Sequence, residues 1–176
     1  MLYDSDLTVY DIQDFCADNL KNSAEFSSFC TTTIQATLNF ETDAVMNDID
    51  MLPPLPYCTV HGGNENQDLR QPEWGHEYEI VLVFGIADTT SETNPKPPFQ
   101  ETNGMRKYTS ARNIEKIAKK AILVLKETMQ RTGINGDYDI QIISANGTKT
   151  ATGEADDMNY ILSLSFSYLE NLQKGC

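Results

Sequence analysis

The sequence predicts an α+β fold, with a single mixed, mainly antiparallel β-sheet and helices packed on one face of that sheet. Two segments predict the sheet, because large side chains alternate with small or polar ones over residues 158–169 and again over residues 74–87. A third segment predicts the helical layer, because residues 110–132 carry apolar side chains at the spacing of an amphipathic helix. The length of 176 residues and the hydrophobic content of 40% predict one domain over residues 1–176.

The last strand shows the clearest alternation. Its even positions are large: Tyr160, Leu162, Leu164, Phe166 and Tyr168. Its odd positions, after Ile161, are serines: Ser163, Ser165 and Ser167. Each large side chain contributes roughly 1.5–3 kcal/mol when it is buried, so the whole apolar face contributes on the order of 10 kcal/mol once covered. The small hydroxyl side chains of the other face suit a flat surface packed against another copy of the protein.

Residues 1–30 predict an N-terminal helical segment. Thr8 is placed to cap a helix, with Asp11 near its positive end. An apolar stripe follows at helical spacing, formed by Val9, Ile12, Cys16 and Leu20. Residues 21–23 end this helix, and a second short helix holds Phe26, Phe29 and Cys30. Alternation with threonine-rich positions then predicts a strand over residues 32–40.

The middle of the chain predicts two strands separated by a polar segment. Residues 43–50 are acidic and predict a helical turn or loop, and the prolines at positions 53, 54 and 56 predict a stiff, extended lead-in. A short strand follows over residues 57–61, and we expect Gly62-Gly63 to end it. One face of the strand over residues 74–87 is apolar, while the other changes from acidic to apolar. The end of that strand is therefore expected to be buried on both sides.

Residues 89–109 predict a long Pro-rich loop or arm that orders on a partner, because they contain Pro95, Pro97 and Pro98 and show no period. We expect Ser110 to cap the main helix and Gly133 to end it after residue 132. A strand over residues 138–143, a turn at Asn146-Gly147 and the terminal strand complete the chain.

The chain is strongly acidic, with 26 Asp and Glu against 13 Lys and Arg and a net charge of −13. Nucleic acid phosphates repel such a chain, so we expect no specific binding to DNA or RNA. The charge is uneven, because residues 1–69 hold twelve acids and one base, while eight of the thirteen bases lie in residues 106–131. This asymmetry favours head-to-tail pairing of copies in a ring. A solvated acidic surface beside a helix with a lysine face is the simpler interpretation.

The four cysteines, Cys16, Cys30, Cys58 and Cys176, include no C-x-x-C pair. There is no signal peptide and no apolar run long enough to span a bilayer, so we expect a reduced, cytoplasmic protein with no membrane partner. Cys58, His61 and His76 could be metal ligands, but residues three apart on one strand point to opposite faces, and tetrahedral zinc needs four ligands. We expect no metal, no cofactor and no catalytic residues.

Four segments carry a resemblance to a known family. They are Pro56-Tyr57-Cys58-Thr59-Val60, the pattern Trp74-x-x-x-Tyr78-Glu79-Ile80-x-Leu82, the helix over residues 113–129, and the pattern Asp157-x-Asn159-Tyr160-x-Leu162-x-Leu164-x-Phe166. In this order they resemble the tail terminator (tail completion or head–tail joining) proteins of long-tailed bacteriophages. The resemblance spans most of residues 9–170.

The resemblance implies a homohexameric ring that caps the tail tube, stops its polymerisation and joins the tail to the head. Its partners would be the tail tube and head connector proteins, in the host cytoplasm and in the assembled virion or tail-like particle. A closed ring needs two different patches on each copy. The candidate interface residues are Arg112, Lys116, Lys119, Lys120, Trp74, Ser163, Ser165 and Ser167. The alternative is a small acidic protein-binding adaptor of a prophage, without catalytic activity, whose residues 89–109 capture a partner.

Overall fold

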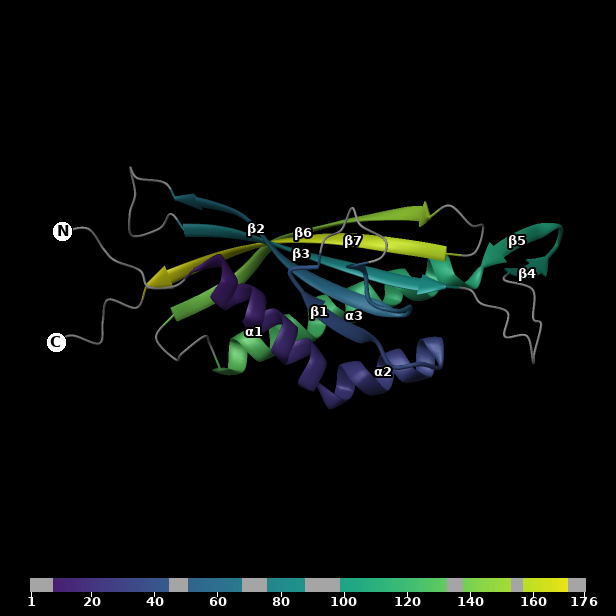
Figure 1. The fold of residues 1–176 in the computed structure, drawn as a ribbon, viewed down its shortest axis with the longest axis horizontal. Coiled ribbons are helices and arrows are strands. Elements are labelled where there is room, and N and C mark those ends of the chain that lie inside the picture. Colours follow the sequence, from purple (N-terminus) through teal and green to yellow (C-terminus); the bar gives the residue numbers. More distant parts are fainter. Residues whose placement is uncertain are drawn as a thin grey trace.

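The computed structural model describes residues 8–44, 51–67, 76–87, 99–132, 138–152 and 157–170 (Figure 1). Its elements, in chain order, are α1 (Val9–Asn22), α2 (Ala24–Ile34), β1 (Asn39–Thr42), β2 (Tyr57–Gln67), β3 (His76–Ala87), β4 (Phe99–Thr102), β5 (Met105–Tyr108), α3 (Thr109–Thr132), β6 (Tyr138–Thr152) and β7 (Asp157–Glu170). The expected α+β class is confirmed. None of the described helices is both long and apolar enough to cross a membrane.

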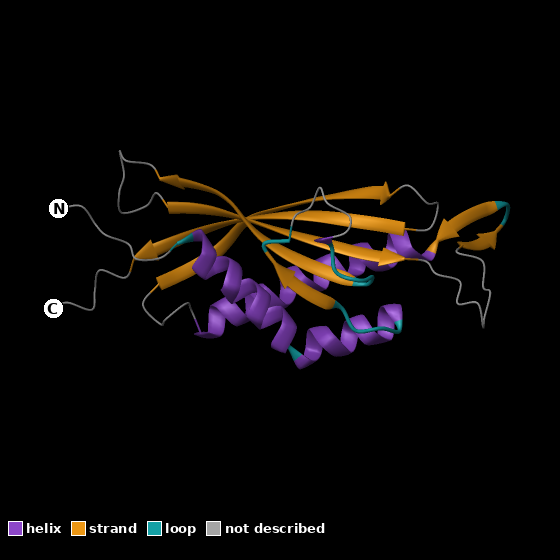
Figure 2. Ribbon diagram, in the orientation of Figure 1, coloured by secondary structure: helices purple, strands orange, loops and turns teal. Residues whose placement is uncertain are grey.

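The main sheet has five strands in the order β1-β2-β3-β7-β6. Only β1 and β2 run parallel, and the other three neighbouring pairs are antiparallel, so the sheet is mixed and mainly antiparallel as expected. The helices lie on one face of this sheet (Figure 2). Strands β4 and β5 form a separate two-stranded sheet, which the expectation of a single sheet did not include.

The core lies between the helices and the apolar face of β3 and β7. Register pairs Tyr78 with Phe166, Ile80 with Leu164 and Leu82 with Leu162, and all six side chains are buried. The residues that cover them from α1 and α3 have the predicted helical spacing: Ile12, Cys16, Leu20, Ile114, Ile117, Ala121 and Leu125. Period-2 strands and period-3.6 helices therefore meet as the sequence predicts.

The opposite face of the sheet is uncovered by helices but is not bare throughout. Tyr57 and Val83 face this side and are only 3% and 4% exposed. The Tyr57 ring and Leu55 close over Gly85, where an added Cβ would lie 2.5 Å from the Tyr57 ring and 2.9 Å from Leu55 Cδ2. The end of β3 is therefore buried on both sides, which confirms the prediction for that strand.

The start and end of α1 agree with the prediction. The Thr8 hydroxyl accepts a hydrogen bond from Asp11 N at 3.3 Å, and Asp11 Oδ2 accepts one from Thr8 N at 2.6 Å, which completes a capping box. These bonds to Thr8 stabilise the carboxylate and lower the pKa of Asp11. Ser23 ends α1 and caps α2, because its hydroxyl accepts from Phe26 N at 3.1 Å.

The strand predicted over residues 32–40 is wrong except for its last two residues. Helix α2 continues to Ile34, and Gln35 ends it in a left-handed conformation with φ of 57°. The Thr31 and Thr32 hydroxyls each donate to the carbonyl four residues back, at 2.9 Å, so threonine is accommodated within the helix. Only Asn39–Thr42 forms a strand.

The break predicted at Gly62-Gly63 is also wrong. Strand β2 passes this point through a β-bulge between Gly62 and Glu65 and continues to Gln67. The buried side chain of Gln13 on α1 accepts a hydrogen bond from Gly62 N and donates one to Asp43 Oδ1 at 3.0 Å. The glycines therefore bend the strand rather than end it.

The turn predicted at Asn146-Gly147 is replaced by continuous strand. Gly147 pairs opposite Leu162 inside β6, and a Cβ at Gly147 would collide with the Tyr160 ring. The Asn-Gly pair that does form a turn is Asn103-Gly104, where φ values of 54° and 73° join β4 to β5. Residues 99–108 of the predicted loop are thus a hairpin.

The main helix is confirmed with a small shift at its start. Helix α3 begins at Thr109, so the buried Ser110 lies inside the helix rather than capping it. Gly133, Pro95, Pro97 and Pro98 lie outside the described residues.

Candidate functional site

Strand β1 forms one edge of the main sheet and keeps part of its backbone free. Asn39 N donates to Pro56 O at 2.9 Å, and Asp43 N donates to Val60 O at 3.3 Å, so the odd positions of β1 bond to β2. The backbone groups of Phe40 and Thr42 therefore point away from β2, toward the open edge. Outside the ladder with β2, no backbone hydrogen bond from either N–H is found within the described residues.

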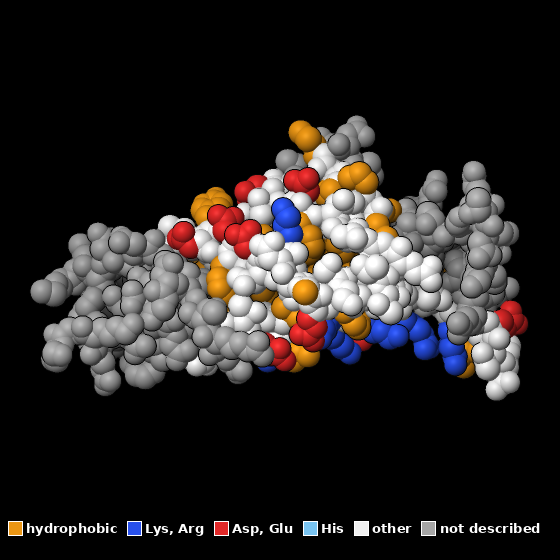
Figure 3. Space-filling view, turned by 90° about the horizontal axis from the view of Figure 1, so that it is seen from below, with side chains coloured by type: hydrophobic (Ala, Val, Ile, Leu, Met, Phe, Trp, Pro, Cys, Tyr) orange, Lys and Arg blue, Asp and Glu red, His pale blue; other side chains and the backbone are white. Residues whose placement is uncertain are grey.

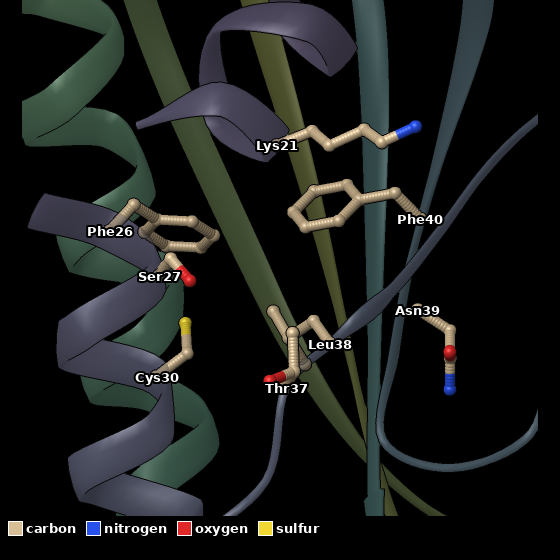
Figure 4. Close-up of a pocket in the computed structure, with 8 residues that line it drawn as sticks. All are labelled: Lys21, Phe26, Ser27, Cys30, Thr37, Leu38, Asn39 and Phe40. Carbon is tan, nitrogen blue, oxygen red and sulfur yellow. The ribbon is translucent and has the colours of Figure 1, made fainter. Parts of the chain in front are cut away.

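Two adjoining hollows lie beside this edge, between β1 and the corner where α1 meets α2. The first has a volume of about 320 Å³ and is lined largely by Phe26, Cys30, Leu38 and Phe40 (Figure 4). The second, of about 390 Å³, adds three carboxylates: Asp14, Asp18 and Glu41. Lys21 and Phe40 line both hollows, so together they form one depression, which we call the β1 groove.

The apolar end of the β1 groove follows from local packing. Phe26 and Phe40 meet edge to face, with ring centroids 6.3 Å apart and planes at 63°. In Figure 4, Phe26 and Cys30 lie on the α2 side of the hollow, opposite Leu38, and the Lys21 side chain extends past Phe40. Burial raises the pKa of the Cys30 thiol to about 12, which leaves it protonated and poorly nucleophilic. The apolar end of the groove is thus suited to packing against apolar side chains of a partner rather than to thiol chemistry.

Charges of opposite sign lie on opposite edges of the helix-covered side. In Figure 3, Asp and Glu side chains gather along the edge formed by α1, and a row of Lys and Arg side chains, with a few acidic side chains beside it, lies along the other edge, over α3. Two of the predicted interface cations, Arg112 and Lys116, are exposed on α3. Neither forms an ion pair with another residue in the described segments.

The other two predicted cations are already paired within the chain. Lys119 and Lys149 bind the Glu115 carboxylate at 3.0 and 2.9 Å, and these hydrogen bonds lower the pKa of Glu115 to about 2. Lys120 pairs with Glu25 of α2 and lies 6.0 Å from the centre of the Phe29 ring. Lys120 therefore ties α2 to α3, and it is less available to a partner than Arg112 or Lys116.

The predicted serines lie on the face that the helices leave uncovered. Ser163 and Ser165 are half-buried there, and Ser165 bonds Ser144 of β6 with 2.9 Å between the hydroxyl oxygens. Ser167 belongs to β7, but its side chain is outside the described residues, as is the whole of Trp74.

Of the three residues considered as metal ligands, Cys58 and His61 are not brought together, and the side chain of His76 is outside the described residues. Cys58 faces the helices and is fully buried, whereas His61 faces the opposite side, with its Nε2 2.8 Å from Thr59 Oγ1. Burial lowers the pKa of His61, although the negative charge of Asp43 acts in the other direction. Among the described side chains, no three of His, Cys, Asp and Glu are grouped to hold a metal ion.

Sequence reasoning missed both the β1 groove and the β4–β5 hairpin. The groove joins residues from three separate elements, so no local pattern could indicate it. The hairpin had a local signal, the Asn103-Gly104 dipeptide, which is the typical two-residue hairpin turn.

Comparison of the sequence with models of known protein families finds no match, and comparison with curated proteins finds none either.

Proposed function

We propose that the protein is a structural, self-associating ring component that resembles phage tail terminators. Its ring would cap the tail tube, stop polymerisation and join the tail to the head connector in the virion or tail-like particle. The observation that carries this proposal is the separation of charge: acids along α1 and β1 on one edge, exposed bases along α3 on the other. Opposite edges of opposite sign favour a head-to-tail contact between copies.

The exposure of two cations on α3 supports a choice of contact residues. Arg112 and Lys116 are exposed and without an ion pair in the described segments, so they are the cations for the acidic edge of the next copy. The flat serine surface around Ser163 and Ser165 remains a second candidate contact, for the tube or the connector. The net charge of −13 would let DNA pass through the ring without adhering to it.

Native mass spectrometry of the full chain tests the proposal. Six copies of 19.7 kDa give a species of about 120 kDa. Lys116→Glu should shift the population toward smaller species, since it places an acid against an acid. Lys126→Glu is the matched control, because it reverses a charge that is also exposed, further along α3. A chain that stays monomeric at every concentration would refute the ring.

A small acidic protein-binding adaptor is the second candidate, and the free edge of β1 favours it. An exposed strand edge beside an apolar hollow suits an extended peptide, which adds as a further strand. This candidate predicts a monomer in native mass spectrometry, together with binding of an extended basic peptide that Asp18→Lys abolishes. The ring predicts a defined oligomer without any added peptide.

A further inference from the structure

We propose that the β4–β5 hairpin of one copy docks in the β1 groove of the next, with β5 adding as a strand parallel to β1. The inference rests on the proposed ring and names its contact. It assigns Met105 to the apolar hollow and Lys107 to the acidic one.

The hairpin is built as a projection. Its two-residue turn at Asn103-Gly104 closes β4 onto β5, and these strands pack mainly on each other. Figure 1 shows the hairpin extending from one end of the molecule, beyond the start of α3. Met105 is 62% exposed, so its side chain is accessible to a partner on this projecting hairpin.

The groove offers what a strand needs at an edge. Phe40 and Thr42 direct their N–H and C=O groups away from β2, where an added strand would meet them. Side chains on one face of that strand would enter the space between β1 and the α1–α2 corner. Addition of a strand therefore satisfies the backbone and fills the hollows in a single contact.

The side chains of β5 match the two hollows in order and in spacing. Met105 and Lys107 are two residues apart, so they share one face of β5, about 6.5–7 Å from each other. Along β1, the apolar hollow borders Leu38 and Phe40, and the acidic hollow borders Phe40 and Thr42. A parallel β5 places Met105 against the apolar end and Lys107 against the acidic end.

Charge supports the same pairing. Three carboxylates, Asp14, Asp18 and Glu41, line the acidic hollow against the single cation Lys21. In the proposed contact, Lys107 of one copy meets this net negative charge on the next copy. Arg112 and Lys116 extend the basic surface from the hairpin along α3. The hairpin projects from one end of the molecule, away from the groove (Figure 1), so the contact joins two different surfaces and can continue around a ring.

Cysteine cross-linking between two singly substituted chains tests the contact directly. Both chains carry Cys176→Ser, and the buried native cysteines Cys16, Cys30 and Cys58 stay in place. One chain carries Met105→Cys and the other Thr37→Cys, an exposed position that lines the apolar hollow. The matched control is Thr32→Cys, which is exposed on α2 but does not line the groove. Under mild oxidation, we expect a disulfide-linked dimer with Thr37→Cys, at least about tenfold more abundant than with Thr32→Cys.

The outcomes separate the docking from the ring. A wild-type species of about 120 kDa without the Met105–Thr37 cross-link keeps the ring and overturns the docking. A selective cross-link in a chain that is otherwise monomeric supports the docking and refutes the stable ring. Equal cross-linking of both threonine positions overturns the docking, and so does a complete lack of cross-linking in a monomer.

A charge exchange gives a second, independent measurement. Lys107→Glu and Asp18→Lys should each weaken self-association about tenfold, and the double variant should restore it. In an equimolar mixture of the two single variants, the hairpin of each is complementary in charge to the groove of the other, so the mixture should also restore association, in species where the two variants alternate. Asp18 is exposed, and its replacement leaves the core intact, which circular dichroism checks. Failure of the double variant to recover would overturn the pairing of these two residues.

Discussion

Leu164 and Ser163 are neighbours in β7, yet they belong to two different surfaces. Leu164 is fully buried beneath the helices, opposite Ile80, whereas Ser163 is half-buried on the side that none of the described helices covers, opposite Val81. A single period-2 strand thus supplies both a core and a flat, small-residue surface. The comparison separates stability from interaction: the helix side holds the fold together, and the open side is free to vary or to meet a partner.

The largest expected effect is the loss of stability when a buried residue on the helix-covered face of β7 is truncated. Leu164→Ala removes a side chain that is 0% exposed, so it should lower the free energy of unfolding by about 2–5 kcal/mol. Ser163→Ala, one residue away, should change it by less than about 0.5 kcal/mol. Urea denaturation of both variants, followed by circular dichroism, measures the difference. Similar losses from the two variants would contradict the assignment of the two faces.

A second variant, Gly85→Ala, tests whether the Tyr57 ring covers part of the face that carries no helices. An alanine Cβ at Gly85 would lie 2.5 Å from the Tyr57 ring, so Gly85→Ala should cost about 1–3 kcal/mol of stability. This cost is large for a face without helices. In a Tyr57→Ala background the same substitution should cost much less, because the ring that it strikes is gone. Thermal unfolding of the four chains gives the coupling, and additive losses would show that Tyr57 does not cover Gly85.

The patterns that the sequence carries locally were sufficient for the central strands and for α1. Alternation in β3 and β7 depends only on the side chains of each strand, and the Thr8–Asp11 capping box closes within four residues. Threonine within residues 32–40 misled the prediction. It favours strands in general, but here Thr32 lies in α2, where its hydroxyl donates a hydrogen bond to the Ser28 carbonyl. A local pattern predicts the structure of a segment correctly where no contact with a distant residue favours a different structure.

The two Asn-Gly pairs show most clearly that a local sequence pattern does not always predict the local structure. Asn103-Gly104 turns the chain, while Asn146-Gly147 lies flat in β6, because Tyr160 occupies the space beside Gly147. The candidate site could likewise be predicted only in part from the sequence. Exposure of Arg112 and Lys116 could be predicted from the helix period, but the pairing of Lys120 with Glu25 joins residues 95 positions apart. Tertiary contacts decide such cases, and one sequence does not display them.

The smallest expected effect concerns the rim of the open face, at His61. Burial lowers its pKa in the folded chain below the ordinary histidine value of 6.5, so the unfolded chain binds more protons just below that pH. The contribution of neutral His61 to the free energy of unfolding is complete above pH 6.5, and it is lost as the pH falls through the lowered pKa. Stability should therefore decline on acidification, by less than Gly85→Ala costs.

His61→Asn isolates this contribution, because asparagine is polar but does not titrate near neutrality. Urea denaturation between about pH 8 and pH 5 should show a flatter profile for the variant than for the parent chain. The carboxylates titrate in both chains, so only the difference between the two profiles belongs to His61. A partner seated on this rim would bury the ring further and steepen the parent profile, whereas superimposable profiles would mean that folding does not lower the pKa of His61.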